Sequence, residues 1–227
     1  MSTTGLIRFN KQPVAWATHF VGFLGAVVGM VALLQHAGEH PSAHPAKYAS
    51  LATYGVGLVM VFGSSSVYHF FDIGEWGNRW LRRLDHCAIF ALILGSYAPF
   101  IVHLQEGSWR IVVLTVVVVL CLGGMVFKIA WIDCPDLLGA GIYLVLAWMA
   151  VIPAVGWLPQ LSSEAITLLV CGGLAFTVGA VVYVKEWPDP WPKVFGHHEI
   201  WHVFVLAGAG AHYFFMWNLV PYEVPPF

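Results

Sequence analysis

The sequence has few charged residues and few cysteines. Only 10% of its 227 residues are Asp, Glu, Lys or Arg, and 59% are hydrophobic, whereas soluble domains carry about 25% charged residues. The formal net charge of −2 at pH 7 argues against a nucleic-acid partner. The cysteines lack paired spacing, so they are interpreted as small buried residues and not as disulfides or a thiolate metal site. They are Cys87, Cys121, Cys134 and Cys171.

Long apolar stretches separate the charged residues. A helix needs about 20 mostly apolar residues to cross a bilayer, and seven stretches come close to that length. We therefore predict an all-α membrane protein, a seven-helix transmembrane bundle in which residues 1–227 form a single domain. The first stretch is interpreted as a retained helix because it is longer than a signal-peptide core. The predicted spans are Pro13–Leu34, Tyr48–Phe71, Cys87–Val102, Ile111–Phe127, Leu137–Leu158, Ile166–Val184 and Ile200–Val220.

The basic residues predict the orientation of this bundle. Segments on the same side as the N-terminus hold eight of the ten Lys and Arg residues, and the other side holds Lys47 and Arg110. Because cytoplasmic loops carry an excess of Lys and Arg, we predict a cytoplasmic N-terminus and an outside C-terminus. The eight residues are Arg8, Lys11, Arg79, Arg82, Arg83, Lys128, Lys185 and Lys193.

A pair of histidines opens the last apolar stretch. His198 and His202 are four residues apart in the sequence HHEIWH, so a helix places them on one face, as two ligands of one metal ion would be. Polar groups in a membrane helix are costly and usually functional. His212 is deeper and rotated away from His202, and is interpreted as a hydrogen-bonded core residue. His19, alone near the start of the first span, is interpreted as an interfacial group.

The second and third spans add polar residues at the same predicted depth. Ser65 and His69 are four residues apart near the cytoplasmic end of the second span. Ser65 could simply bond to its own helix, with His69 at the headgroup level. Asp85, in the sequence LRRLDHCAIF, starts the third span. It could cap that helix, pair with Arg82 or Arg83, or act as an acid–base group facing His69.

Topology brings these groups to one end of the bundle. Three imidazoles from His69, His198 and His202 would make a tetrahedral Zn²⁺ site with one open position. Asp85 could orient or deprotonate a water molecule there, and Ser65 could steady it, which suits metal-assisted hydrolysis. The sequence HEIWH also fits the zincin pattern H-E-x-x-H, in which Glu199 would be the general base. A protease would also need a peptide-binding edge, which the sequence does not show.

The set of motifs resembles a known family. Ser65-x3-His69, Asp85 within LDHCAIFALILGSYAP, and His198-x3-His202 are similar to the three motifs of the hemolysin III and progestin/adiponectin receptor family. The short N-terminus resembles the bacterial hemolysin III branch. The resemblance implies zinc binding by the three histidines, with Asp85 and Ser65 completing the site. The receptor branch is associated with hydrolysis of lipid amides such as ceramide, and the hemolysin III branch with cytolysis and membrane lipid homeostasis.

Three functions follow as hypotheses. The first is a zinc-dependent hydrolase acting on a membrane lipid amide or ester from the cytoplasmic leaflet. The second is a pore-forming cytolytic protein, although the spans lack the regular polar stripe that would line a channel. The third is a lipid-state sensor in which zinc is structural. All three predict a multi-pass protein of the plasma membrane with membrane lipids as partners, and they leave a monomer or a homo-oligomer open.

Overall fold

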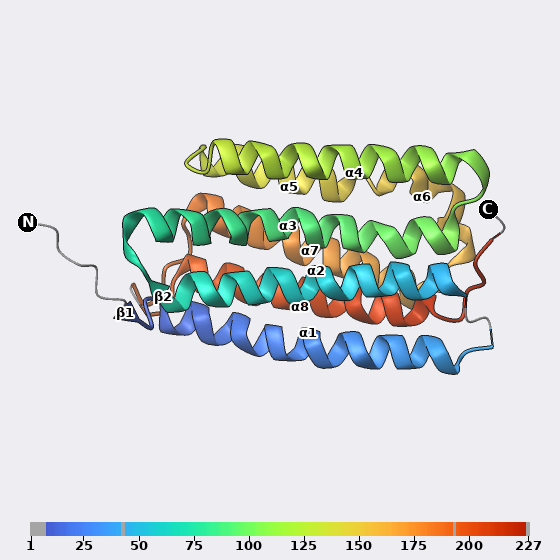
Figure 1. The fold of residues 1–227 in the computed structure, drawn as a ribbon, viewed down its shortest axis with the longest axis horizontal. Helices are drawn as coiled ribbons and strands as arrows, with labels where there is room; N and C mark the ends of the chain where they lie inside the picture. The colour runs from blue at the N-terminus through green and yellow to red at the C-terminus, as the bar shows by residue number, and fades with distance from the viewer. Residues whose placement is uncertain (1–7, 42–43, 193, 226–227) are drawn as a thin grey trace, which may run out of the picture.

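The computed structural model describes residues 8–41, 44–192 and 194–225, which form a bundle of long helices (Figure 1). Seven helical segments in these ranges are long and apolar enough to cross a membrane. The predicted seven-helix fold is therefore confirmed. The elements are β1 (Arg8–Phe9), α1 (Pro13–Glu39), α2 (Pro45–Phe70), β2 (Phe71–Asp72), α3 (Gly74–Leu104), α4 (Gly107–Ala130), α5 (Asp136–Trp148), α6 (Val151–Trp157), a 3₁₀ turn (Leu158–Gln160), α7 (Ser163–Lys185) and α8 (His197–Leu219).

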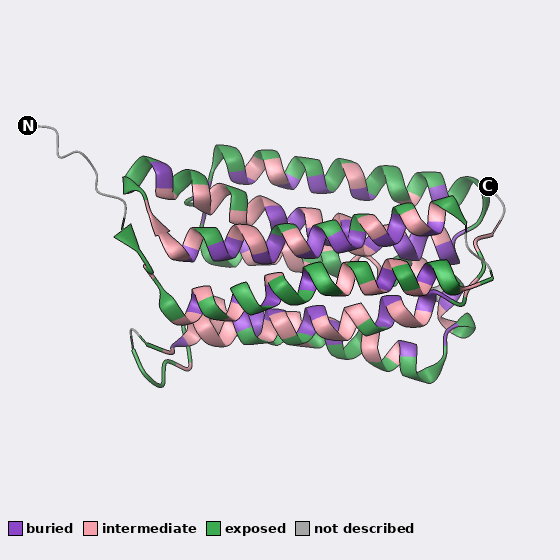
Figure 2. Ribbon diagram, turned by 60° about the horizontal axis from the view of Figure 1, so that its bottom comes forward, coloured by how far each residue is buried: buried purple, intermediate pink, exposed green. Residues whose placement is uncertain are grey.

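Helices α2, α3, α7 and α8 lie between α1 on one side and α4, α5 and α6 on the other (Figure 1). More than half of the most apolar 18-residue window is buried in α2 and in α3 (56% and 61%). The core includes Tyr54, Leu58 and Phe62 of α2 together with Phe215 and Met216 of α8. Figure 2 shows exposed residues along the outer helices. Apolar exposed side chains are what a bilayer requires of the outer faces, so the polar residues inside the bundle carry the functional information.

Helices α2 and α3 approach each other closely at Gly95. A Cβ atom added there would lie 2.8 Å from the backbone oxygen of Thr53 and 3.1 Å from Cα of Tyr54. Because the backbone of α2 cannot rotate away as a side chain can, we expect Gly95→Ala to destabilise the protein by about 1–3 kcal/mol. The measurement is the thermal unfolding midpoint of purified protein in detergent.

The matched control for this prediction is Gly123→Ala in α4. A Cβ atom at Gly123 meets nothing within 4 Å, and both glycines lie inside helices, so the gain in helix propensity is similar. A lower midpoint for Gly95→Ala than for Gly123→Ala is expected. Equal midpoints for the two variants would show that the α2–α3 contact tolerates a methyl group.

The start of α3 differs from the prediction. The stretch 72–84 lies between the predicted second and third spans and is therefore expected to be an interfacial loop, but α3 begins at Gly74 and includes most of it. Gly74 has a φ of +82°, which turns the chain into the helix. The residues that follow contain no proline before Asp85, so nothing ends the helix where its apolar part ends. Asp85 therefore lies inside a continuous helix and does not cap one.

The fifth span is also divided where a continuous helix was predicted. Helix α5 ends at Trp148 and α6 begins at Val151. Pro153 has no backbone N–H, and its ring conflicts with the carbonyl group four residues earlier, that of Met149. The chain instead forms a turn in which the N–H of Ile152 donates to the Met149 carbonyl at 3.0 Å.

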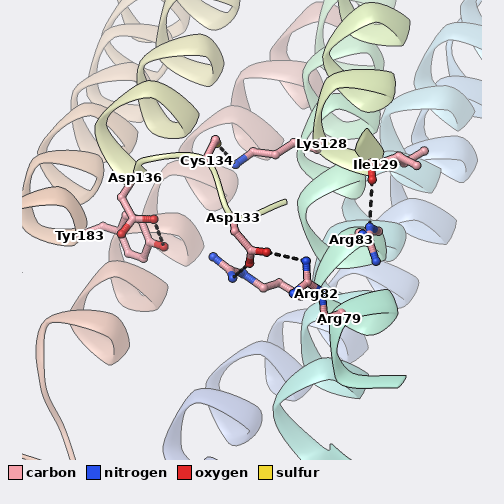
Figure 3. A network of polar contacts seen from close by, with 9 residues as sticks. All are labelled: Arg79, Arg82, Arg83, Lys128, Ile129, Asp133, Cys134, Asp136 and Tyr183. Atoms are coloured by element: carbon pink, nitrogen blue, oxygen red, sulfur yellow. Dashed lines mark hydrogen bonds and ion pairs between the residues drawn. The ribbon is translucent and has the colours of Figure 1, made fainter. Parts of the chain in front are cut away.

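A polar network fastens the start of α3 to the connection between α4 and α5 (Figure 3). Asp133 accepts from Arg79 at 2.6 Å and from Arg82 at 3.1 Å, and Arg83 donates to the backbone oxygen of Ile129 at 3.0 Å. Arg79 and Arg82 are thus paired with Asp133, and among the described residues neither Arg82 nor Arg83 forms an ion pair with Asp85. Because these ion pairs are partly exposed, each contributes about 0–1 kcal/mol. Figure 3 also shows contacts of Lys128 with Cys134 and of Tyr183 with Asp136.

Candidate metal centre

Three histidines from two helices meet at the end of the bundle where β1 and β2 lie. His69 is in the last turn of α2, and His198 and His202 are in the first two turns of α8. One ring nitrogen of each lies within 4.8 Å of the other two. His69 and His202 are buried, and His198 is half-buried. The α-helical spacing of four residues puts His198 and His202 on one face of α8, as the sequence predicts.

The hydrogen bonds of two of these rings determine which nitrogen is free to bind. Nδ1 of His202 lies 3.1 Å from the backbone oxygen of Ala15. A carbonyl oxygen only accepts, so Nδ1 carries the proton and Nε2 keeps its lone pair. Nδ1 of His69 is hydrogen-bonded to Oε1 of Gln12, which assigns the same tautomer to that ring. Such partners on the far nitrogen are typical of metal-binding histidines.

The distance between His69 and His198 fits two ligands of a single metal ion. Nε2 of His69 and Nε2 of His198 are 3.4 Å apart. Two nitrogen ligands about 2.0–2.1 Å from a tetrahedral ion would lie about 3.3 Å apart. A donor set of three neutral imidazoles suits zinc, copper, iron or nickel more than magnesium or calcium. His69, His198 and His202 could therefore hold a transition-metal ion.

Ser65 links the histidines to Asp85. Its hydroxyl oxygen is buried and lies 2.7 Å from Nδ1 of His19, and its side chain is also near enough to influence the carboxyl group of Asp85 in α3. A hydroxyl group can donate one bond while accepting another, so Ser65 can join both partners. Among the described residues, the group within 4.8 Å contains the three histidines and not Asp85. The catalytic roles of Asp85 and Ser65 stay predictions.

His19 also belongs to this centre, which the sequence interpretation missed. Its ring is 4% exposed and stacks on that of His202, with centroids 3.6 Å apart and an angle of 9° between planes. Lone pairs of imidazole nitrogens lie in the ring plane, so parallel stacked rings do not direct them at one ion. His19 therefore contacts a candidate ligand without joining it as a fourth one. The sequence does contain a signal that His19 could face the site: it is seven residues after Gln12, a spacing that puts two residues on the same face of a helix.

Two other polar residues of α8 have partners of their own. Nε2 of His212 is 3.2 Å from the backbone oxygen of Leu169, in line with its interpretation as a hydrogen-bonded histidine. The carboxylate of Glu199 accepts from the backbone N–H of Gly196 at 2.9 Å. This contact caps the start of α8. Glu199 therefore has a structural role at the start of the helix, which favours helix capping over a zincin-like catalytic base as the role of Glu199 in HEIWH. Lys193, whose charge could pair with Glu199, lies outside the described residues.

The fold and the histidine group together define a multi-pass membrane protein with a candidate metal centre. The family model described as "Haemolysin-III related" matches residues 7–213. The chain is 34% identical over 205 residues to a protein named "Hemolysin-3 homolog" from Bacillus subtilis (strain 168), which covers 90% of this chain and 92% of that protein. It is 27% identical over 212 residues to "Hemolysin-3" from Bacillus cereus, covering 93% of each.

A more distant similarity extends to eukaryotic proteins. The "Adiponectin receptor protein" of Drosophila melanogaster is 30% identical over 191 residues, which cover 74% of this chain and 42% of that protein. The chain therefore belongs to the haemolysin-III-related family, and the resemblance predicted from its motifs is confirmed.

Proposed function

We propose that this protein is a zinc-dependent hydrolase that cleaves an amide or ester bond of a membrane lipid. The observation that carries the proposal is the meeting of three imidazole nitrogens within 4.8 Å at one end of a membrane-spanning bundle. When bound, zinc supplies Lewis acidity toward a water molecule and a carbonyl oxygen. A lipid is the proposed substrate because the site is built by helices long and apolar enough to lie in a bilayer.

The residues around the histidines have complementary roles in this proposal. His69, His198 and His202 hold the ion. Asp85 takes a proton from the attacking water and returns it to the leaving amine or alcohol, as a general base and then a general acid. The single proton of the Ser65 hydroxyl holds the Asp85 carboxylate in place, and once Asp85 has taken up a proton, the Ser65 proton can be donated to developing negative charge.

The proposed orientation places the site at the cytoplasmic leaflet of the plasma membrane. Its support is the distribution of Lys and Arg, which is a charge asymmetry of the kind that sets topology. Lys47 is in the first turn of α2 and Arg110 is in the first turn of α4, both at the end far from the histidines. Seven of the eight residues predicted to be cytoplasmic are in the described ranges, at or near the ends of elements on the histidine side: Arg8, Lys11, Arg79, Arg82, Arg83, Lys128 and Lys185.

Metal removal tests the proposal directly. Purified protein in lipid vesicles is supplied with ceramide and with ester-linked analogues, and the released fatty acid is measured. We expect turnover in the zinc-loaded protein, loss of turnover after chelation, and recovery with Zn²⁺ but not with Mg²⁺, because imidazole ligands do not suit magnesium. Equal turnover before and after complete metal removal would contradict the proposal.

A second candidate function rests on the name of one relative. The similar protein from Bacillus cereus is named "Hemolysin-3", which suggests a pore-forming activity. The same vesicles, loaded with a fluorescent dye, distinguish the two functions. Leakage that persists in protein stripped of metal, without lipid turnover, would favour the pore former.

A further inference from the structure

The chain preceding α1 runs along the end of α2. Strand β1 pairs antiparallel with β2, with Arg8 opposite Asp72 and Phe9 opposite Phe71. The pairing continues as the N–H of Lys11 donates to the Phe70 carbonyl at 3.3 Å. Burial lowers the pKa of Lys11, whose ammonium group lies 4.0 Å from the centre of the Tyr68 ring.

This pairing brings Gln12 to His69. The backbone N–H of Gln12 donates to the carbonyl oxygen of His69 at 3.0 Å, and its side-chain Oε1 accepts from Nδ1 of the same residue. Gln12 is also the residue that precedes the first turn of α1. Two bonds, one from the backbone and one from the side chain, therefore join this residue to a candidate ligand in another helix.

We propose that Gln12 is a positioning residue of the metal centre, which fixes the tautomer and ring orientation of His69 so that its Nε2 lone pair faces His198 and His202. This inference rests on the proposed function, because it assumes that the three histidines bind a metal. With the amide oxygen gone, Nδ1 of His69 loses its acceptor, and the ring can take the other tautomer or rotate. Loss of such a partner typically weakens metal binding by about 10–100-fold.

The first turns of α1 also contact His202, the other buried candidate ligand. The Ala15 carbonyl is 3.1 Å from Nδ1 of His202, and the Thr18 hydroxyl is 3.3 Å from the same atom. Gln12, Ala15 and His19 follow one another at spacings of three and four residues, so they share the face of α1 that meets the site. The acceptor for His69 is the Gln12 side-chain amide, so a substitution can remove it without moving the backbone, whereas the Ala15 acceptor of His202 is a backbone carbonyl.

The experiment compares Gln12→Leu with Gln12→Glu. Leucine has a similar size but accepts no hydrogen bond, whereas glutamate keeps an oxygen acceptor. Both leave the backbone bonds of Lys11 and Gln12 in place. The control is Gln160→Leu at the other end of the bundle, where the Gln160 amide donates to the Gly156 carbonyl at 3.2 Å. The readouts are Zn²⁺ affinity, from competition with a chromophoric chelator, and the visible absorption spectrum of the Co²⁺-loaded protein.

We expect about 10–100-fold weaker Zn²⁺ binding and an altered Co²⁺ spectrum in Gln12→Leu, with both restored in Gln12→Glu and unchanged in Gln160→Leu. Wild-type affinity and spectrum in Gln12→Leu would overturn the inference while leaving the metal centre intact. Equal losses in Gln12→Leu and Gln12→Glu, with lower thermal stability of both metal-free proteins, would show a structural role and also overturn it. If the wild-type protein binds no metal, the proposed function fails first and the role of Gln12 fails with it.

Discussion

Replacing His202 by alanine is expected to remove the bound metal ion from the purified protein. His202 is 2% exposed, and its Nδ1 is engaged with Ala15, so its Nε2 is committed to the centre. The variant would keep His69 and His198, and two imidazoles bind a divalent ion far more weakly than three. Loss of a residue that only hydrogen-bonds to a ligand typically weakens metal binding by about 10–100-fold. Loss of the ligand His202 itself should weaken zinc binding by more than that. Elemental analysis after dialysis should then find near-stoichiometric zinc in the wild type and little in the variant.

The control for this experiment is another histidine of the same helix. His212→Gln keeps a donor for the Leu169 carbonyl and lies almost three turns beyond His202. It should retain its zinc. Circular dichroism must show that both variants are folded before their metal contents are compared. Zinc retained by folded His202→Ala would exclude the three-histidine centre, and zinc lost from His212→Gln as well would show that the loss is not specific to the ligand.

The fold was largely predictable because the bilayer imposes a simple rule on sequence. Apolar length alone located all seven spans. Apolar length failed to predict the helix boundary where a helix extends beyond its apolar part. The start of α3 carries Trp76, Arg79 and Trp80, which suit a helix as well as a membrane interface, and hydropathy cannot distinguish the two. It also failed at Pro153, inside a span predicted as one helix, where the steric conflict with Met149 separates α5 from α6.

The candidate ligands were predictable because helical spacing is a local property of the sequence. The residues that contact them were not predictable, because those contacts join segments that are distant in the sequence. The spacing of four residues indicates that His198 and His202 share a helix face, and the topology places His69 at the same end of the bundle. Gln12 and His19 meet the site only through the packing of α1 against α2 and α8, across separations of 57 residues to His69 and 46 residues to Ser65. Polar residues near a membrane interface have an ordinary explanation, so single residues of this kind gave no signal. Their shared face on α1 would have been the better pattern to examine.

Replacing Asp85 by asparagine is expected to abolish lipid turnover while leaving the zinc in place. Asn is nearly the same size as Asp and can still accept a hydrogen bond from Ser65, the side-chain partner of Asp85. It cannot take up and release a proton, so a general acid–base would be lost. Such a loss typically lowers the rate by about 10²–10⁴-fold. Because Asp85 is outside the group of three nitrogens, zinc content should stay near that of the wild type.

Asp133→Asn is the matched control for this charge change. Asp133 is at the same end of the bundle and pairs with Arg79 and Arg82 on the surface, so its loss should change turnover little. Turnover retained by zinc-loaded Asp85→Asn would refute the hydrolytic role of Asp85. Loss of zinc together with turnover would instead make Asp85 part of the metal-binding set, as expected for a structural zinc in which a carboxylate closes the fourth position. Retained zinc with lost turnover is the combination that a catalytic centre requires.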